Sequence, residues 1–136
     1  MRRTPFALAV GVAVAALALT GCGGGDEEAT PTGTGTTATP AIGSTLQGSV
    51  GPGFVISLTT QDGQDVTTLA PGSYTIEVDD MADIHNFHLT GPGVDESTEV
   101  GEEEKETFQV DLQPGSYSFV CDPHAGSLNG SFEVSG

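Results

Sequence analysis

Strict alternation of apolar and polar residues is the feature that most restricts how this chain can fold. Every second side chain is apolar in residues 74–79, and residues 107–112, 116–121 and 132–134 repeat the pattern. A period of two puts successive side chains on opposite faces of an extended strand, so that one face can be buried. The pattern therefore predicts half-buried β-strands, and no segment of this region has the period of a helix.

Pairs of turn-forming residues separate these segments. Asp-Gly, Pro-Gly and Gly-Pro pairs occur at 62–63, 71–72, 91–92 and 114–115, and weaker strand patterns lie at 46–50 and 54–59. Several short strands at this spacing are typical of a β-sandwich or barrel. The sequence thus predicts one all-β domain over residues 46–136.

A short repeat, Leu-x-Pro-Gly-Ser-Tyr, ends at Tyr74 and again at Tyr117. A tyrosine that follows such a turn can form a tyrosine corner, in which its hydroxyl bonds to backbone a few residues upstream. A reused turn followed by an ordinary core tyrosine is the alternative. Both interpretations give these residues a structural role.

The N-terminal third of the chain has a different composition. A positive start, an apolar run over residues 6–19 and the sequence Leu-Thr-Gly-Cys at 19–22 resemble the signal and lipobox of bacterial lipoproteins. A plain secretory signal near a cysteine is the alternative. Residues 23–45 are rich in Gly, Thr and Pro and lack aromatics, which is typical of a flexible tether. We therefore expect a signal peptide at 1–21, a linker at 22–45 anchored through lipidated Cys22, and location in the cell envelope outside the cytoplasm.

The chain is strongly acidic. It has 19 Asp and Glu residues against 3 Lys and Arg, for a net charge of -16, and Lys105 is the single lysine or arginine after Arg3. Such a surface repels nucleic acid and anionic lipid headgroups, so we expect no nucleic-acid partner. It favours either a basic partner protein or simple solubility. The run 102–104 beside Lys105 and Glu106 is interpreted as a solvated edge that discourages strand pairing between molecules.

Two residues near the C-terminal end are candidate metal ligands. If Cys22 is lipidated, Cys121 has no cysteine left to pair with, and an unpaired cysteine in an exported domain indicates metal binding, reactivity or an intermolecular bridge. His124 follows three residues later, across a proline-containing turn that can bring its imidazole back beside the sulfur. A thiolate with imidazoles suits copper or zinc.

Strand parity selects a third ligand. His85, Phe87 and Leu89 lie on one face of an extended segment, and this face must be buried because it carries Phe87 and Leu89. His85 is therefore expected to point inward as a ligand. His88 falls on the other face and is expected to face solvent, with a weak peripheral metal site as the alternative.

The pattern of these motifs resembles the plastocyanin/azurin branch of the cupredoxins, the blue-copper proteins. The resemblance rests on His-Asn at 85–86, Cys-x-x-His at 121–124, the Pro-Gly-Ser-Tyr turn and the final Gly-Ser-Phe-Glu-Val, and it covers residues 46–136. It implies a monomeric Greek-key β-sandwich of about 7–8 strands. It also implies one mononuclear copper site (Cu+/Cu2+) held by His85, Cys121 and His124.

The resemblance further implies roles around the site. Asn86 would tie its segment to the loop that begins at Asp122, although an exposed turn residue is an equal interpretation of Asp122. His124 would be the surface port for electrons, beside a small apolar patch of Ala125, Gly126 and Leu128.

One position departs from the family pattern. Cupredoxins usually carry a weakly bound axial Met a few residues after the loop His, and the equivalent position here is Leu128, which has no donor atom. We expect a three-coordinate site with a raised reduction potential. Axial ligation by Met81, or a site that holds no metal, are the alternatives.

Together these features predict a membrane-tethered one-electron carrier that docks a redox partner through that partner's basic face. Copper capture, delivery or buffering in the cell envelope is the alternative function, and a zinc or metal-free adhesive module is a third. The sequence has no catalytic triad, paired carboxylates or phosphate-binding loop, so we expect no enzymatic activity.

Overall fold

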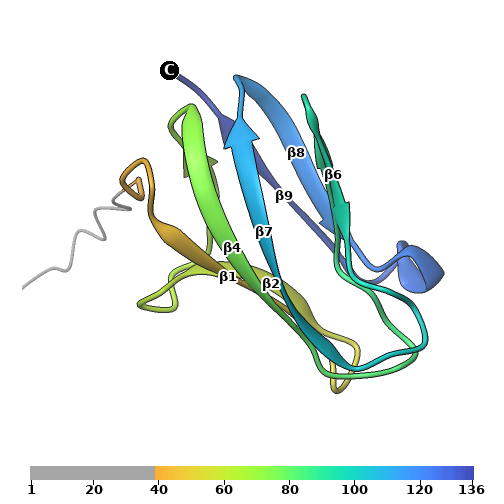
Figure 1. Ribbon diagram of the computed structural model, residues 1–136. Coiled ribbons are helices and arrows are strands. Elements are labelled where there is room, and N and C mark those ends of the chain that lie inside the picture. Colours follow the sequence, from red (N-terminus) through yellow and green to blue (C-terminus); the bar gives the residue numbers. More distant parts are fainter. Residues whose placement is uncertain (1–38) are drawn as a thin grey trace, which may run out of the picture. The chain divides into compact units, whose positions relative to one another are not determined.

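The computed structural model describes residues 39–136, which form a sandwich of two mixed β-sheets (Figure 1). One sheet has the order β2-β1-β4-β7 and the other the order β3-β9-β8-β5-β6. Within the described residues there is no α-helix, only one 3₁₀ turn, η1. The strands and the turn are β1 (Thr45–Val50), β2 (Ile56–Thr60), β3 (Thr68–Leu69), β4 (Gly72–Asp80), β5 (His88–Gly91), β6 (Val94–Ser97), β7 (Glu104–Leu112), β8 (Gly115–Val120), η1 (Asp122–His124) and β9 (Asn129–Val134).

The predicted all-β sandwich is confirmed, with more strands than the sequence indicated. The alternating segments became β4, β7, β8 and β9, and the two weaker patterns became β1 and β2. The nine strands include β3 and β6, which the sequence analysis missed. The first spans only two residues, and the second, Val-Asp-Glu-Ser, has a single apolar side chain and so shows no alternation.

Strand pairing brings three loops to one end of the sandwich. β1 pairs in parallel with β4, so that Val50 and Asp80 lie side by side where both strands end. In the other sheet, Val120 at the end of β8 pairs with His88 at the start of β5. The loops 51–55, 81–87 and 121–128 therefore leave the sheets at these strand ends.

The space between the sheets is filled by the inward side chains of the alternating strands. Tyr117 stacks on Phe132 and Phe87 stacks on Phe119, with ring centroids 5.2 and 5.6 Å apart. Burial of this apolar surface is the main source of stability for such a domain. The largest fully buried side chains are Tyr74, Tyr117, Phe87, Phe132, Leu46, Leu58, Leu69, Ile76, Leu89, Leu112, Leu128 and His85.

Both repeated tyrosines bond to backbone four residues upstream, as expected for tyrosine corners. The hydroxyl of Tyr74 donates to the carbonyl of Ala70 (2.9 Å). The hydroxyl of Tyr117 accepts from the amide of Gln113 (2.9 Å) and donates to the carbonyl of Pro92 (2.8 Å). The repeat is thus structural, and each copy anchors the entry into a long strand.

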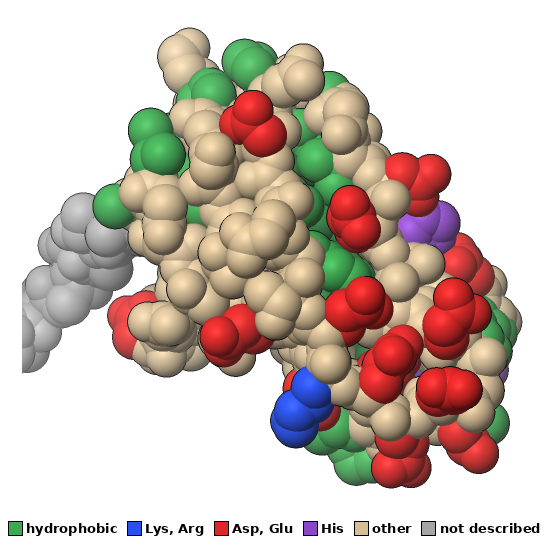
Figure 2. All heavy atoms as spheres, in the orientation of Figure 1, with side chains coloured by type: hydrophobic (Ala, Val, Ile, Leu, Met, Phe, Trp, Pro, Cys, Tyr) green, Lys and Arg blue, Asp and Glu red, His purple; other side chains and the backbone are tan. Residues whose placement is uncertain are grey.

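The acidic run leads into an edge strand, and its last residue, Glu104, begins that strand. β7 is the outer strand of its sheet and begins with Glu104, Lys105 and Glu106. Lys105 forms an ion pair with Asp79 on the neighbouring strand. Figure 2 shows acidic side chains gathered over the lower right of this face. Charged side chains on an open edge oppose pairing with another sheet.

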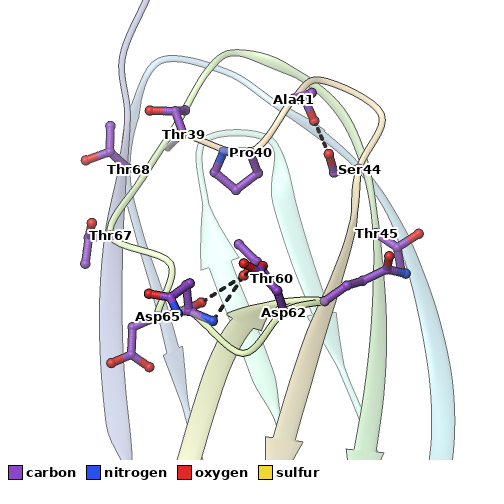
Figure 3. Close-up of a pocket in the computed structure, with 12 residues that line it drawn as sticks. Thr39, Pro40, Ala41, Ser44, Thr45, Thr60, Asp62, Asp65, Thr67 and Thr68 are labelled. Atoms are coloured by element: carbon purple, nitrogen blue, oxygen red, sulfur yellow. Dashed lines mark hydrogen bonds between the residues drawn. The ribbon is translucent and has the colours of Figure 1, made fainter. Parts of the chain in front are cut away.

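The segment before β1 packs against the domain at the sandwich end where β1 begins. The amide of Gly43 donates to the carbonyl of Ser73 (2.8 Å), and Thr39 and Pro40 line one side of a surface pocket of about 520 Å³. Figure 3 shows Thr60 at the end of β2, and Asp62 and Asp65 of the β2–β3 loop, on the other side. The predicted signal peptide, Cys22 and most of the linker lie outside the described residues. No helix in residues 39–136 is long and apolar enough to cross a membrane.

Candidate metal centre

His85 lies in a loop and not in a strand, which corrects one step of the sequence analysis. The chain leaves β4 at Asp80, turns over Ala82–His85 with the amide of His85 bonded to the carbonyl of Ala82 (3.0 Å), and enters β5 only at His88. His85 is nevertheless fully buried, as expected. The alternation rule fails for its neighbour Asn86, which is also buried, at 2% exposure.

Cys121 and His124 are held by a short loop that folds back on itself. Cys121 follows the last residue of β8 and is buried, and η1 begins at the next residue. Pro123 stands in the first turn of η1, where its fixed backbone angle favours helical geometry. The amide of His124 donates to the carbonyl of Cys121 (2.9 Å), which brings the partly buried imidazole back toward the sulfur.

The three side chains converge on one point. The Sγ of Cys121 lies 3.5 Å from the Nδ1 atoms of both His85 and His124, and these two nitrogens are 3.2 Å apart. A point equidistant from the three atoms is roughly 2 Å from each, about the length of a metal–imidazole or metal–thiolate bond. Among the described residues, this is the one group of three His, Cys, Asp or Glu side chains close enough to share an ion. The donor set therefore fits a bound metal.

The loop between β1 and β2 completes the surroundings of the two imidazoles. The Nε2 of His85 lies 3.1 Å from the carbonyl oxygen of Gly53. The ring of Phe54 stands edge-on to both imidazoles, with centroids 5.4 Å from His85 and 5.0 Å from His124, and it is 63% exposed. Sequence analysis missed both residues, because nothing in a Gly-Phe pair indicates contact with a histidine more than thirty positions away.

Asn86 and Asp122 form the tie that the resemblance implied. The side-chain amide of Asn86 donates to the carboxylate of Asp122 (2.8 Å), and the backbone amide of Asp122 donates to the side-chain oxygen of Asn86 (2.8 Å). The residue after one histidine is thereby joined to the residue after the cysteine. These two bonds fix the His85 loop relative to the Cys121 loop.

His88 points away from the cluster, as expected, but it is not a free surface side chain. Its Nδ1 lies 2.9 Å from Asp122 and its Nε2 lies 2.8 Å from Asp95. The hydrogen bond with Asp122, helped by Asp95, raises the pKa of His88 above its usual range despite partial desolvation. The same bond, followed by the one from Asn86, lowers the pKa of Asp122. The two carboxylates bind opposite ring nitrogens, so this arrangement is an ion-pair bridge and differs from a convergent metal site.

Leu128 is buried, although the resemblance implied that it belongs to an apolar surface patch beside His124. Its carbonyl accepts a hydrogen bond from the amide of Cys121 (3.0 Å), and its side chain is 1% exposed. It therefore cannot contribute to a surface patch beside His124, where Ala125 and the larger side chain of Phe54 are exposed. Met81, the alternative axial residue, is 36% exposed and its amide bonds to the carbonyl of Val50.

Comparison with known proteins gave matches only among solved structures. No protein-family model and no curated protein sequence matches the chain. A structure of the copper protein rusticyanin matches with 16% identity and a TM-score of 0.48, over 67% of this chain and 76% of its own. Rusticyanin from Thiobacillus ferrooxidans matches with 18% identity and a TM-score of 0.47 over the same shares. A rusticyanin variant with a methionine replaced by leucine matches with 19% identity and a TM-score of 0.46, again over these shares.

The site itself defines the chemistry open to this domain. Two imidazoles and one cysteine sulfur arranged in a triangle are donors of the types that bind copper. The two-sheet architecture and the cluster of His85, Cys121 and His124 together fit a cupredoxin domain with a single copper site.

Proposed function

We propose that this protein is a one-electron carrier of the cell envelope, with His85, Cys121 and His124 as the ligands of a type 1 copper ion. The observation that carries the proposal is the compact triangle of Nδ1, Nδ1 and Sγ atoms at the end of the sandwich. One-electron exchange would come from the Cu(I)/Cu(II) couple of the bound ion. The residues of the chain supply the fixed geometry, the exclusion of water and the contact surface.

A site suited to electron exchange must change little between oxidation states. His85 and Cys121 are both fully buried, and the loops that carry them are joined by the reciprocal Asn86–Asp122 bonds. Such outer hydrogen bonds set the orientation of ligands and resist their movement. This rigidity supports a carrier over a protein that opens to release its ion.

His124 is the ligand through which electrons would reach a partner. It is the least buried of the three, and the exposed ring of Phe54 lies beside it. We propose that a redox partner with a basic face docks here for a short time, guided by the acidic surface. The same surface disfavours nucleic acid, and we propose that the carrier acts as a monomer.

The N-terminal sequence supports placement at a membrane. In this proposal Cys22 carries the lipid, and the Gly- and Thr-rich linker lets the domain reach a partner bound to the same membrane. The proposal gives the protein no enzymatic activity of its own.

Voltammetry of the copper-loaded full chain tests the carrier function against copper delivery. We expect a reversible one-electron wave that persists over many cycles with the ion retained. Loss of copper on each reduction would instead identify a delivery or buffering protein and would overturn the carrier proposal. A chain that binds zinc but gives no wave with copper would also overturn it.

A further inference from the structure

A buried carboxylate lies at the root of the loop that carries His85. Asp80 is the last residue of β4, and it is 2% exposed. Burial raises the pKa of Asp80, while hydrogen bonds from Thr98 and Ala82 act in the opposite direction. Burying a carboxyl group costs stability unless its oxygens find donors. Nothing in the proposed electron path uses this side chain, so its presence needs another explanation.

Thr98 connects Asp80 to the far end of the loop. Its hydroxyl donates to Oδ2 of Asp80 (2.8 Å) and accepts from the backbone amide of Phe87 (2.8 Å). The backbone amide of Thr98 also donates to the carbonyl of Phe87 (3.1 Å). Thr98 is itself 2% exposed, so both of its hydroxyl bonds are shielded from water. Linking the carboxylate of Asp80 to the amide of Phe87 in this way, a hydrogen-bond relay, needs a group that donates one hydrogen bond and accepts another. A hydroxyl group does both.

The other oxygen of Asp80 faces the near end of the same loop. Oδ1 accepts from the amide of Ala82 in a longer contact of 3.4 Å, and the carbonyl of Ala82 in turn accepts from the amide of His85 (3.0 Å). The carboxylate of Asp80 thus contacts Ala82, which starts the turn before His85. Through Thr98 it is also linked to Phe87, two residues after His85. An asparagine could offer only one acceptor oxygen in this place.

We propose that Asp80, acting through Thr98, is a positioning residue for His85 that fixes both ends of loop 81–87 and so sets the place of the Nδ1 atom in the ligand triangle. The inference rests on the proposed copper function for its spectroscopic consequence. Its structural consequence, a loop held in place before any metal binds, is independent of copper.

Thr98→Val tests the relay, because valine has the shape of threonine without the hydroxyl. In the metal-free full chain, we expect hydrogen exchange of the Phe87 amide to become up to about tenfold faster, with a smaller increase at His85. In the copper-loaded chain, we expect altered intensities of the visible bands and an altered copper hyperfine splitting. Thr98→Ser should restore both readouts, because it keeps the hydroxyl.

A matched control separates positioning from general loss of stability. The hydroxyl of Thr90 on β5 makes a partly buried hydrogen bond with Ser118 on β8 (3.0 Å) and contacts no residue of loop 81–87 through it. Thr90→Val should lower the melting temperature without changing the copper spectrum. Asp80→Asn keeps the shape of the carboxylate but has one acceptor oxygen fewer. It should loosen the end of the loop at Ala82 and change the copper spectrum in the same direction as Thr98→Val does.

The two proposals fail in different ways. A wild-type chain without a copper–thiolate band would overturn the copper function, while exchange at Phe87 and His85 would still decide the relay in the metal-free protein. The relay is overturned if Thr98→Val lowers the melting temperature as Thr90→Val does, yet keeps wild-type exchange at His85 and Phe87. If the wild type does show the copper–thiolate band, the relay is also overturned when the copper spectrum of Thr98→Val matches that of the wild type.

Discussion

At the scale of single residues, the hydrogen bond at Nε2 of His85 determines whether Nδ1 has a lone pair free to bind a metal. The carbonyl of Gly53 can only accept, so its contact with Nε2 requires a proton on that nitrogen. In the neutral imidazole the Nδ1 atom is then the unprotonated one, and it faces the sulfur of Cys121. A neutral imidazole with a free lone pair is the form that binds a metal, so this backbone contact prepares His85 as a ligand.

Leu128→Met tests the axial position at the same scale. If residue 128 lies beside the ion, the variant adds a weak sulfur donor, which favours Cu(II) over Cu(I) and lowers the reduction potential. We expect a lower potential by voltammetry with little change in stability, since Leu and Met have similar volumes. Leu128→Ile is the control without a donor atom. An unchanged potential in the methionine variant would place residue 128 away from the axial direction.

The His88 bridge predicts a pH dependence of stability. Its pKa is raised from the ordinary value of 6.5, chiefly by the hydrogen bond with Asp122. A raised pKa in the folded state gives stability that is complete below the unfolded pKa and is lost as pH rises through the folded value. From about pH 6 upward we therefore expect wild type to lose stability relative to His88→Gln. Urea denaturation at several pH values measures this, and parallel curves for the two proteins would contradict it.

At the scale of elements, the sequence predicted strands and buried side chains well where polar and apolar residues alternate, and poorly where contacts with the backbone of distant loops determine the structure. Parity predicted the burial of His85 correctly although residues 85–87 are not in a strand, because Phe87 and Leu89 still had to face the core. It failed for Asn86, which is buried because its amide binds Asp122 from a distant loop. Gly53 and Phe54 could not be found, since only the pairing of β1 with β4 brings their loop to the site.

The tyrosine corners give a prediction for the strand entries. Tyr117→Phe leaves the amide of Gln113 and the carbonyl of Pro92 without their partner, whereas Tyr74→Phe affects only the carbonyl of Ala70. Removing one partner of a buried hydrogen bond costs about 1–3 kcal/mol. We expect the change at Tyr117 to lower the free energy of unfolding more than the change at Tyr74. Chemical denaturation of both variants would show the order, and equal losses would contradict it.

At the scale of the whole molecule, the negatively charged surface favours encounters with cations over encounters with anions. Lys105 is the only lysine or arginine in residues 39–136, and it is already paired with Asp79. We expect electron exchange with a small cationic redox reagent to be faster than with an anionic one of similar potential. Salt should slow the first and accelerate the second, because it screens attraction and repulsion alike. Stopped-flow rates that do not depend on ionic strength would rule out steering by this surface.

The visible spectrum of the copper-loaded chain tests the central claim most directly, because it reports whether the sulfur of Cys121 binds the ion. We expect an intense thiolate-to-copper band in the wild type and in His88→Gln, whose imidazole lies outside the ligand triangle. Cys121→Ser should lack the band. A colourless wild type, or a band that survives the loss of the thiol, would contradict the assignment of His85, Cys121 and His124 as a copper site.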